Sequence, residues 1–253
     1  MKLFSKSAFT LAEVLITLGI IGMVAQMTLP ALMQSTDKQA NLSRLKKFYA
    51  SFNQGMQMYM QSEDCPDLAC TNIFLGKHDS AEWQSAVLSA LKISFKNVVP
   101  CVGSECKVII KYLGGGSPFS LFEYPTYYTV KMSDGSLVAF RDADSQNCYV
   151  SETGKIKGIC SFVYVEVNGA KFPNTRGRDF FIFILAADGV LYPYKGAEYA
   201  KWYEGSDDIE ASSAYWQTDT GDCGTAGSDV LPANTEGGSC AARIMESGWI
   251  MDY

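Results

Sequence analysis

One apolar run near the N-terminus constrains this chain more than any other feature. Between Phe9 and Leu29 the only strongly polar side chains are Glu13 and Gln26. A helix over this range would span about 30 Å at 1.5 Å per residue, the thickness of the hydrocarbon core of a bilayer. The run therefore predicts a transmembrane helix.

Glu13 is energetically unfavourable within such a helix. A charged side chain there costs roughly 2.5–3.5 kcal/mol, whereas each Leu, Ile or Val contributes about 0.3–0.6 kcal/mol toward insertion. The apolar residues from Val14 to Leu29 can together offset one glutamate. A carboxylate retained at this cost is expected to be functional. The alternative is an ordinary anchor whose glutamate reaches the membrane interface.

The residues before the apolar run form a short basic leader containing Lys2 and Lys6. A secretory signal carries its cleavage site after the apolar stretch, but no good site of that kind follows here. The expected processing point is Ala8, before the run. Cleavage there would leave the apolar helix at the new N-terminus, with a free amine on Phe9.

The stretch from Ala8 to Gly22, A-F-T-L-A-E-V-L-I-T-L-G-I-I-G, resembles the N-terminus of type IV prepilins and type II secretion pseudopilins. The resemblance implies that prepilin peptidase cuts after Ala8, where the family normally has Gly, and methylates Phe9. It also implies assembly roles for Glu13 and for Pro30, where family members often have a helix-kinking proline. The match covers about 30 of the 253 residues.

Electrostatics supports an assembly role for Glu13. An amine on Phe9 and a carboxylate on Glu13 would attract strongly across neighbouring subunits in a medium of low dielectric constant. Left unpaired, each group carries a desolvation penalty. Glu13 therefore favours a state in which a second helix lies alongside, staggered by about one turn.

The cysteines indicate an exported domain. All eight lie beyond residue 64, outside the apolar run, and an oxidising compartment explains this distribution best. They are Cys65, Cys70, Cys101, Cys106, Cys148, Cys160, Cys223 and Cys240. Basic residues after the run favour the opposite orientation by the positive-inside rule, but the cysteines are the stronger indication.

Spacing favours disulfides between nearest neighbours, although 105 full pairings are formally open. The favoured pairs are 65–70, 101–106, 148–160 and 223–240, each of which would staple a local loop. A four-cysteine zinc site drawn from CPDLAC and CVGSEC is the alternative.

The rest of the chain predicts an α+β fold: a long N-terminal helix, its first half transmembrane, packed on an antiparallel meander with disulfide-stapled loops. The predicted divisions are a leader (1–8), a transmembrane and assembly helix (9–30), its amphipathic continuation (31–62) and an exported cysteine-rich domain (63–253). A short helix is expected over 79–92 and a closing helix or strand over 241–253. Strands are expected over 107–113, 126–132, 136–140, 161–167, 180–185 and 190–194, with hairpin turns at Asp134-Gly135 and Asp188-Gly189.

The polar segment around residues 165–179 is a candidate calcium loop. Asn168, Asn174 and Asp179 carry oxygen ligands suited to calcium, and the resemblance adds that some pseudopilins bind calcium in a loop. The spacing matches no EF-hand. The alternative is a structural loop in which Asn and Asp cap turns. No other cofactor is expected.

The sequence predicts a non-enzymatic protein, since no hydrolase, metalloprotease or phosphate-binding motif is present. The formal charge of −6, which becomes −8 without the leader, argues against direct nucleic-acid binding. The resemblance implies a type IV pilus or secretion pseudopilus subunit in the bacterial inner membrane, single-pass, with its domain in the periplasm or outside the cell. Its partners would be prepilin peptidase and other pilin subunits. The alternative is a membrane-tethered exported binding protein that does not polymerise.

Overall fold

The computed structural model describes residues 10–75, 80–142, 149–150, 156, 158–204, 222–223 and 236–253. The chain divides into two compact units, Met1–Ala40 and Asn41–Tyr253. Helix α1, Leu11–Ser62, contributes to both. The boundary therefore falls within the helix, so the globular unit includes the last part of α1.

Within the globular unit, α1 buries one stripe of large side chains. Leu45, Phe48, Phe52, Met56 and Tyr59 are all under 10% exposed, and their three- and four-residue spacing places them on one side of the helix. The predicted continuation of the helix to about residue 62 is confirmed.

Polar side chains attach the same helix to the sheet. The Asn53 Oδ1 atom accepts a hydrogen bond from the backbone N–H of Leu191 at 2.9 Å, and Gln57 Nε2 donates to the carbonyl of Asp188 at 2.8 Å. These bonds satisfy backbone groups at one end of the sheet.

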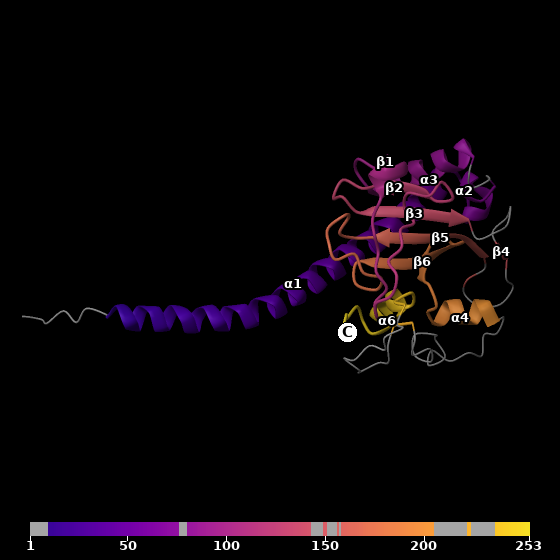
Figure 1. Ribbon diagram of the computed structural model, residues 1–253. Helices are drawn as coiled ribbons and strands as arrows, with labels where there is room; N and C mark the ends of the chain where they lie inside the picture. The colour runs from indigo at the N-terminus through magenta and orange to yellow at the C-terminus, as the bar shows by residue number, and fades with distance from the viewer. Residues whose placement is uncertain are drawn as a thin grey trace, which may run out of the picture. The chain divides into compact units, whose positions relative to one another are not determined.

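The sheet is antiparallel throughout its described strands. Its main path runs β1-β2-β3-β5-β6-β7, and β4 pairs with β5 beside that path. Figure 1 shows β2, β3, β5 and β6 as neighbouring strands. The strands are β1 Val99–Pro100, β2 Tyr128–Lys131, β3 Leu137–Asp142, β4 Tyr149–Val150, β5 Gly158–Glu166, β6 Phe180–Ala186 and β7 Leu191–Pro193.

Both predicted hairpins are confirmed. The turn at Asp134-Gly135 joins β2 to β3, and the turn at Asp188-Gly189 joins β6 to β7. Gly135 and Gly189 have φ values of +88° and +74°, which glycine adopts without the steric cost of a Cβ atom.

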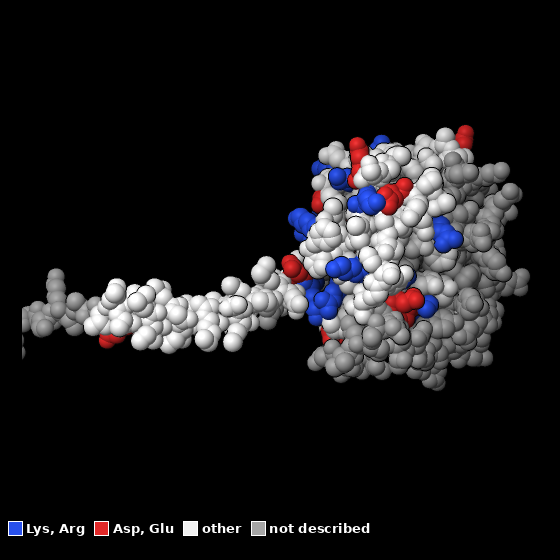
Figure 2. All heavy atoms as spheres, viewed as in Figure 1, with Lys and Arg blue, Asp and Glu red and all other residues white. Residues whose placement is uncertain are grey.

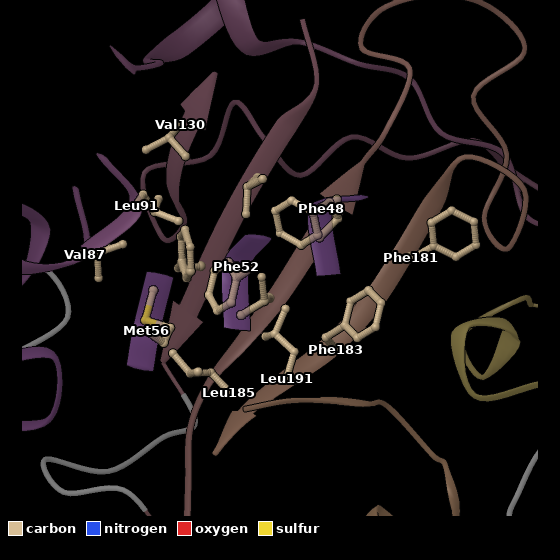
Figure 3. Close-up of a cluster of buried hydrophobic side chains, with 14 of the residues drawn as sticks. Phe48, Phe52, Met56, Val87, Leu91, Val130, Phe181, Phe183, Leu185 and Leu191 are labelled. Carbon is tan, nitrogen blue, oxygen red and sulfur yellow. The ribbon is translucent and has the colours of Figure 1, made fainter. Parts of the chain in front are cut away.

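The sheet separates two apolar layers. On one face α1 and α3 (Ala81–Ser94) pack against inward-facing strand residues such as Phe140, Val163 and Phe183. Figure 3 shows Phe52 and Met56 of α1 in this layer with Phe183, Leu185 and Leu191 of the sheet. On the other face the segment 107–127 covers Ala139, Phe180 and their neighbours (Figure 1). Because each face is covered, alternate residues of β6 enter different cores.

The remaining helices are short. The α3 helix begins one residue after Ser80, whose hydroxyl accepts a hydrogen bond from the Trp83 backbone N–H at 3.1 Å. The closing element predicted after residue 240 is a helix, α6. These elements are η1 Leu68–Cys70, α2 Asn72–Leu75, α3 Ala81–Ser94, η2 Gly103–Cys106, α4 Ala197–Glu204 and α6 Cys240–Glu246.

The predicted strand over residues 107–113 is wrong. This stretch makes only isolated bridges, from Ile110 to Phe119 and from Lys111 to Thr175. It lies over the outer face of the sheet, where Val108 and Ile110 are buried by packing. Burial accounts for its β-branched composition without a continuous ladder.

Three disulfides join nearest neighbours, as predicted: Cys65–Cys70, Cys101–Cys106 and Cys223–Cys240. Cys160 is buried in β5, and its predicted partner Cys148 lies outside the described residues.

A fully buried arginine joins α6 to the C-terminal residues. Arg243 donates from Nε to Asp252 Oδ1 at 3.0 Å and from Nη1 to the carbonyl of Cys223 at 2.8 Å, and its Nη2 atom forms an ion pair with the same Oδ1 atom at 2.9 Å. Its guanidinium lies over the Tyr253 ring, 4.8 Å from the centroid. Burial of a charge is tolerated here because the guanidinium has these partners.

Candidate functional site

The candidate site is the N-terminal part of α1, where sequence predicts the processing and assembly residues. Ala8 and Phe9 lie outside the described residues. The description begins at Thr10, and α1 begins at Leu11 with Glu13 in its first turn.

The Glu13 side chain folds back onto the start of its own helix. Its Oε2 atom accepts hydrogen bonds from the backbone N–H of Thr10 at 2.8 Å and from the Thr10 hydroxyl at 2.9 Å. In return, the Thr10 hydroxyl accepts from the backbone N–H of Glu13 at 3.3 Å. This reciprocal arrangement is a capping box, which satisfies N–H groups that have no partner within the helix.

The capping role was missed by our interpretation of the sequence, although its signal is present. The T-x-x-E pattern of Thr10 and Glu13 immediately precedes an apolar run, as a capping box does. A negative carboxylate is also favoured at a helix N-terminus by the helix dipole. Glu13 therefore has its hydrogen-bond partners within its own helix.

The helix beyond Glu13 presents apolar side chains on all sides. Leu15, Leu18, Ile21, Met23 and Met27 are each more than 60% exposed. Figure 2 shows this part of α1 as a surface almost without charge, in contrast to the mixed charges of the globular unit. Among the described residues, α1 is the helix that is long and apolar enough to cross a membrane.

Hydroxyl groups within this helix bond its backbone. Thr17 and Thr28 each donate at 3.0 Å to carbonyls in the preceding turn, those of Val14 and Val24. Such bonds satisfy the hydroxyls without a partner from outside the helix.

Pro30 lies inside α1, and the helix continues through it. Proline has no N–H, so the carbonyl of Gln26 lacks its usual donor four residues later. Pro30 is therefore a local weak point in an otherwise continuous helix.

The predicted calcium residues only partly come together. Asp179 Oδ2 accepts a hydrogen bond from Asn168 Nδ2 at 3.2 Å, and Asp179 Oδ1 accepts a short one from the Thr175 backbone N–H. The Asn174 backbone carbonyl accepts from the Lys111 backbone N–H at 2.9 Å. Asp179 thus bonds N–H donors, which fits the turn-capping alternative. The described residues contain no cluster of three or more His, Cys, Asp or Glu that could hold a metal.

This loop contains a buried acidic residue that our interpretation of the sequence did not single out. Glu166, at the end of β5, is fully buried, and its Oε1 atom accepts from the Asn168 backbone N–H at 3.1 Å. Within the described structure its Oε2 atom is buried without a hydrogen-bond donor. Burial, and then the negative charge of Asp179, raise the pKa of Glu166. Burial also raises the pKa of Asp179.

A close pair of buried carboxyl groups favours retention of a proton, because two buried negative charges repel one another. The hydrogen bonds to Asn168 and Thr175 hold the pair between β5 and β6. This cluster supports the loop and is fully enclosed, so we treat it as structural.

Comparison with known proteins found no match for this chain among protein-family models, curated proteins or solved structures.

Proposed function

We propose that the chain is a non-enzymatic, membrane-inserted subunit of a pilus or pseudopilus, cut after Ala8, methylated on Phe9 and assembled through its N-terminal helix. The observation that carries this proposal is the exposed apolar helix with one carboxylate, Glu13, in its first turn. Such a helix has to be covered by lipid or by other helices, because water does not solvate its apolar surface favourably.

The capping box defines what Glu13 contributes before assembly. In one chain its carboxylate bonds the backbone N–H and the hydroxyl of Thr10. Cleavage after Ala8 would place a new ammonium one residue before Thr10. A carboxylate accepts several hydrogen bonds at once, so Glu13 can keep its bonds to Thr10 and also receive the ammonium of a neighbour. Apolar burial would then supply affinity, and this ion pair would set the register.

Replacing Glu13→Ala tests the proposal. We expect the full-length variant to reach the membrane and form its disulfides, but to yield no filaments in a cell that contains prepilin peptidase. The matched control is Gln26→Ala, which removes the other strongly polar side chain of the apolar run and should leave filament yield unchanged. Shear preparations examined by electron microscopy provide the measurement.

Two results would contradict the proposal. The first is wild-type filament yield from Glu13→Ala. The second is a membrane-extracted protein whose mass and N-terminal peptide begin at Met1 rather than at methyl-Phe9. The first result would show that Glu13 is not needed for assembly. The second would favour the tethered binding protein that does not polymerise.

A further inference from the structure

A basic groove lies on the globular unit between α1, α3 and the β2–β3 turn. It encloses about 300 Å³. Phe48, Phe95 and Val165 form part of its apolar wall, and Arg44, Lys47 and Lys96 line it with positive charge. A concave site with apolar walls and convergent charged groups is typical of a binding surface.

The three cations of the groove are not neutralised by the described structure. No described acidic residue forms an ion pair with Arg44, Lys47 or Lys96; Arg44 Nη1 only donates to Asn41 Oδ1 at 3.3 Å. The one carboxylate that lines the groove, Asp134, accepts from the backbone N–H and hydroxyl of Ser136 at 3.0 and 2.6 Å. Positive charge is therefore in excess here, although the protein as a whole is acidic.

A complementary acidic surface follows the C-terminal end of α1. Glu63 and Asp64 are exposed and Asp67 is half-buried, and none of them has an ion pair among the described residues. The Cys65–Cys70 disulfide closes a short loop that contains Asp67 and directly follows Asp64. We call Glu63, Asp64 and Asp67 the acidic turn. The disulfide limits its flexibility, which reduces the entropy lost on binding.

One chain cannot bring its own groove and acidic turn together. Lys47 lies in α1, and Glu63 directly follows its last residue. The 16 residues between these positions correspond to about 24 Å along the helix. Two different complementary surfaces on one molecule form a heterologous contact. Such a contact repeats from copy to copy and builds an open filament when the rotation does not close a ring.

We propose that the basic groove binds the acidic turn of a second copy of this chain. This inference rests on the proposed filament function and assigns a contact between the globular units. Exposed ion pairs contribute little affinity, but complementary charges speed association and disfavour wrong partners. The contact therefore chooses which faces meet, while burial of the apolar helices holds the copies together.

Carbodiimide cross-linking of the full-length wild-type protein tests the contact directly. Equal amounts of ¹⁵N-labelled and unlabelled chains are co-assembled, treated and digested. We expect mixed-isotope cross-links that join a peptide containing Lys47 or Lys96 to one containing Glu63, Asp64 or Asp67. The absence of these cross-links would overturn the inference. If the wild-type chain forms no filaments, the same cross-link is sought in the membrane-extracted protein, and its absence there has the same meaning.

Charge reversal provides the second arm. The pairs Lys47→Glu with Lys96→Glu, and Glu63→Lys with Asp64→Lys, should each reduce filament yield about tenfold, equivalent to about 1.4 kcal/mol. Mixing chains that carry the two reversed pairs should restore filaments. Lys92→Glu, on the exposed side of α3 outside the groove, is the matched control and should leave the yield unchanged.

The two proposals fail in different ways. If wild-type filaments form and require Glu13 but are insensitive to both reversals, the groove contact is wrong and the filament function stands. A membrane-extracted protein that begins at Met1 and yields no filaments would contradict the function itself, whatever the reversals do.

Discussion

The two parts of α1 belong to one continuous helix but differ in how their apolar residues are arranged and covered. Beyond Asn41, apolar residues form a stripe that the sheet covers, and Phe52 is fully buried. Between Leu11 and Met33, apolar residues occupy every side of the helix, and Leu18 is 61% exposed. Helix formation is therefore common to both parts, and the distribution of apolar residues around the axis decides what covers each.

Two glutamates in apolar surroundings, Glu13 and Glu166, also differ in how they are stabilised. Glu13 bonds the unpaired N–H of a helix start, so its charge has local donors. Glu166 is enclosed near a second carboxylate, and its raised pKa favours the neutral form. An acidic side chain can thus be stabilised either by donors for its charge or by retention of its proton.

The largest expected effect contrasts the two parts of the helix. Phe52→Ala should lower the free energy of unfolding of the globular unit by about 3–5 kcal/mol, because it leaves a cavity beside Phe48 and Phe140. Leu18→Ala, the matched change in the exposed part, should leave that free energy unchanged. Denaturant titration in detergent measures both. Equal losses of unfolding free energy in the two variants would contradict the division of α1 into two parts.

A smaller effect concerns Glu166. Because folding raises its pKa above the ordinary value of 4.5, the folded state binds more protons than the unfolded state above that pH. Its contribution to stability is therefore complete below about pH 4.5 and is lost as pH rises through the raised pKa. Glu166→Gln, which has no proton to lose, should flatten the fall in unfolding free energy toward alkaline pH.

The exposed Glu105→Gln is the control for Glu166, and it should keep the wild-type pH profile. At alkaline pH we expect Glu166→Gln to be more stable than the wild type by about 1–3 kcal/mol, the usual cost of a buried unsatisfied polar group. Thermal melts from pH 5 to pH 9 provide the measurement. If the stability of Glu166→Gln and that of the wild type changed with pH in the same way, a protonated Glu166 in the folded state would be excluded.

The smallest effect tests the capping box. Thr10→Val removes the hydroxyl partner of Glu13 and should weaken the first turn by about 1 kcal/mol, seen as faster amide exchange near Leu11. Filament yield should fall less than tenfold, since Glu13 keeps its charge. Thr17→Val is the control. If Thr10→Val abolished filaments as completely as Glu13→Ala, capping rather than pairing between subunits would explain the need for Glu13.

Local sequence patterns were sufficient to predict the long helix and the hairpins. Periodic apolar residues from Leu45 to Tyr59 and the Asp-Gly turns depend on neighbours close in sequence, so their structures could be predicted from sequence. The short-range disulfides were predictable for the same reason.

Features that depend on distant partners could not be predicted in this way. Glu166 alternates with Val165 and Val167, a pattern typical of a strand with one face in water. Its face is instead covered by the 107–127 segment, whose first residues, 107–113, are the ones mistaken for a strand. The basic groove likewise combines residues from α1, α3 and the β2–β3 turn, and no sequence spacing relates them.

The course of α1 has a mechanical consequence. The helix enters the globular unit without an intervening linker and supplies Phe48, Phe52 and Met56 to the centre of its core. A force that pulls this part of α1 out of the globular unit would therefore have to separate these side chains from the sheet against which they pack. Detachment of the helix and unfolding of the globular unit would therefore occur together, in one step.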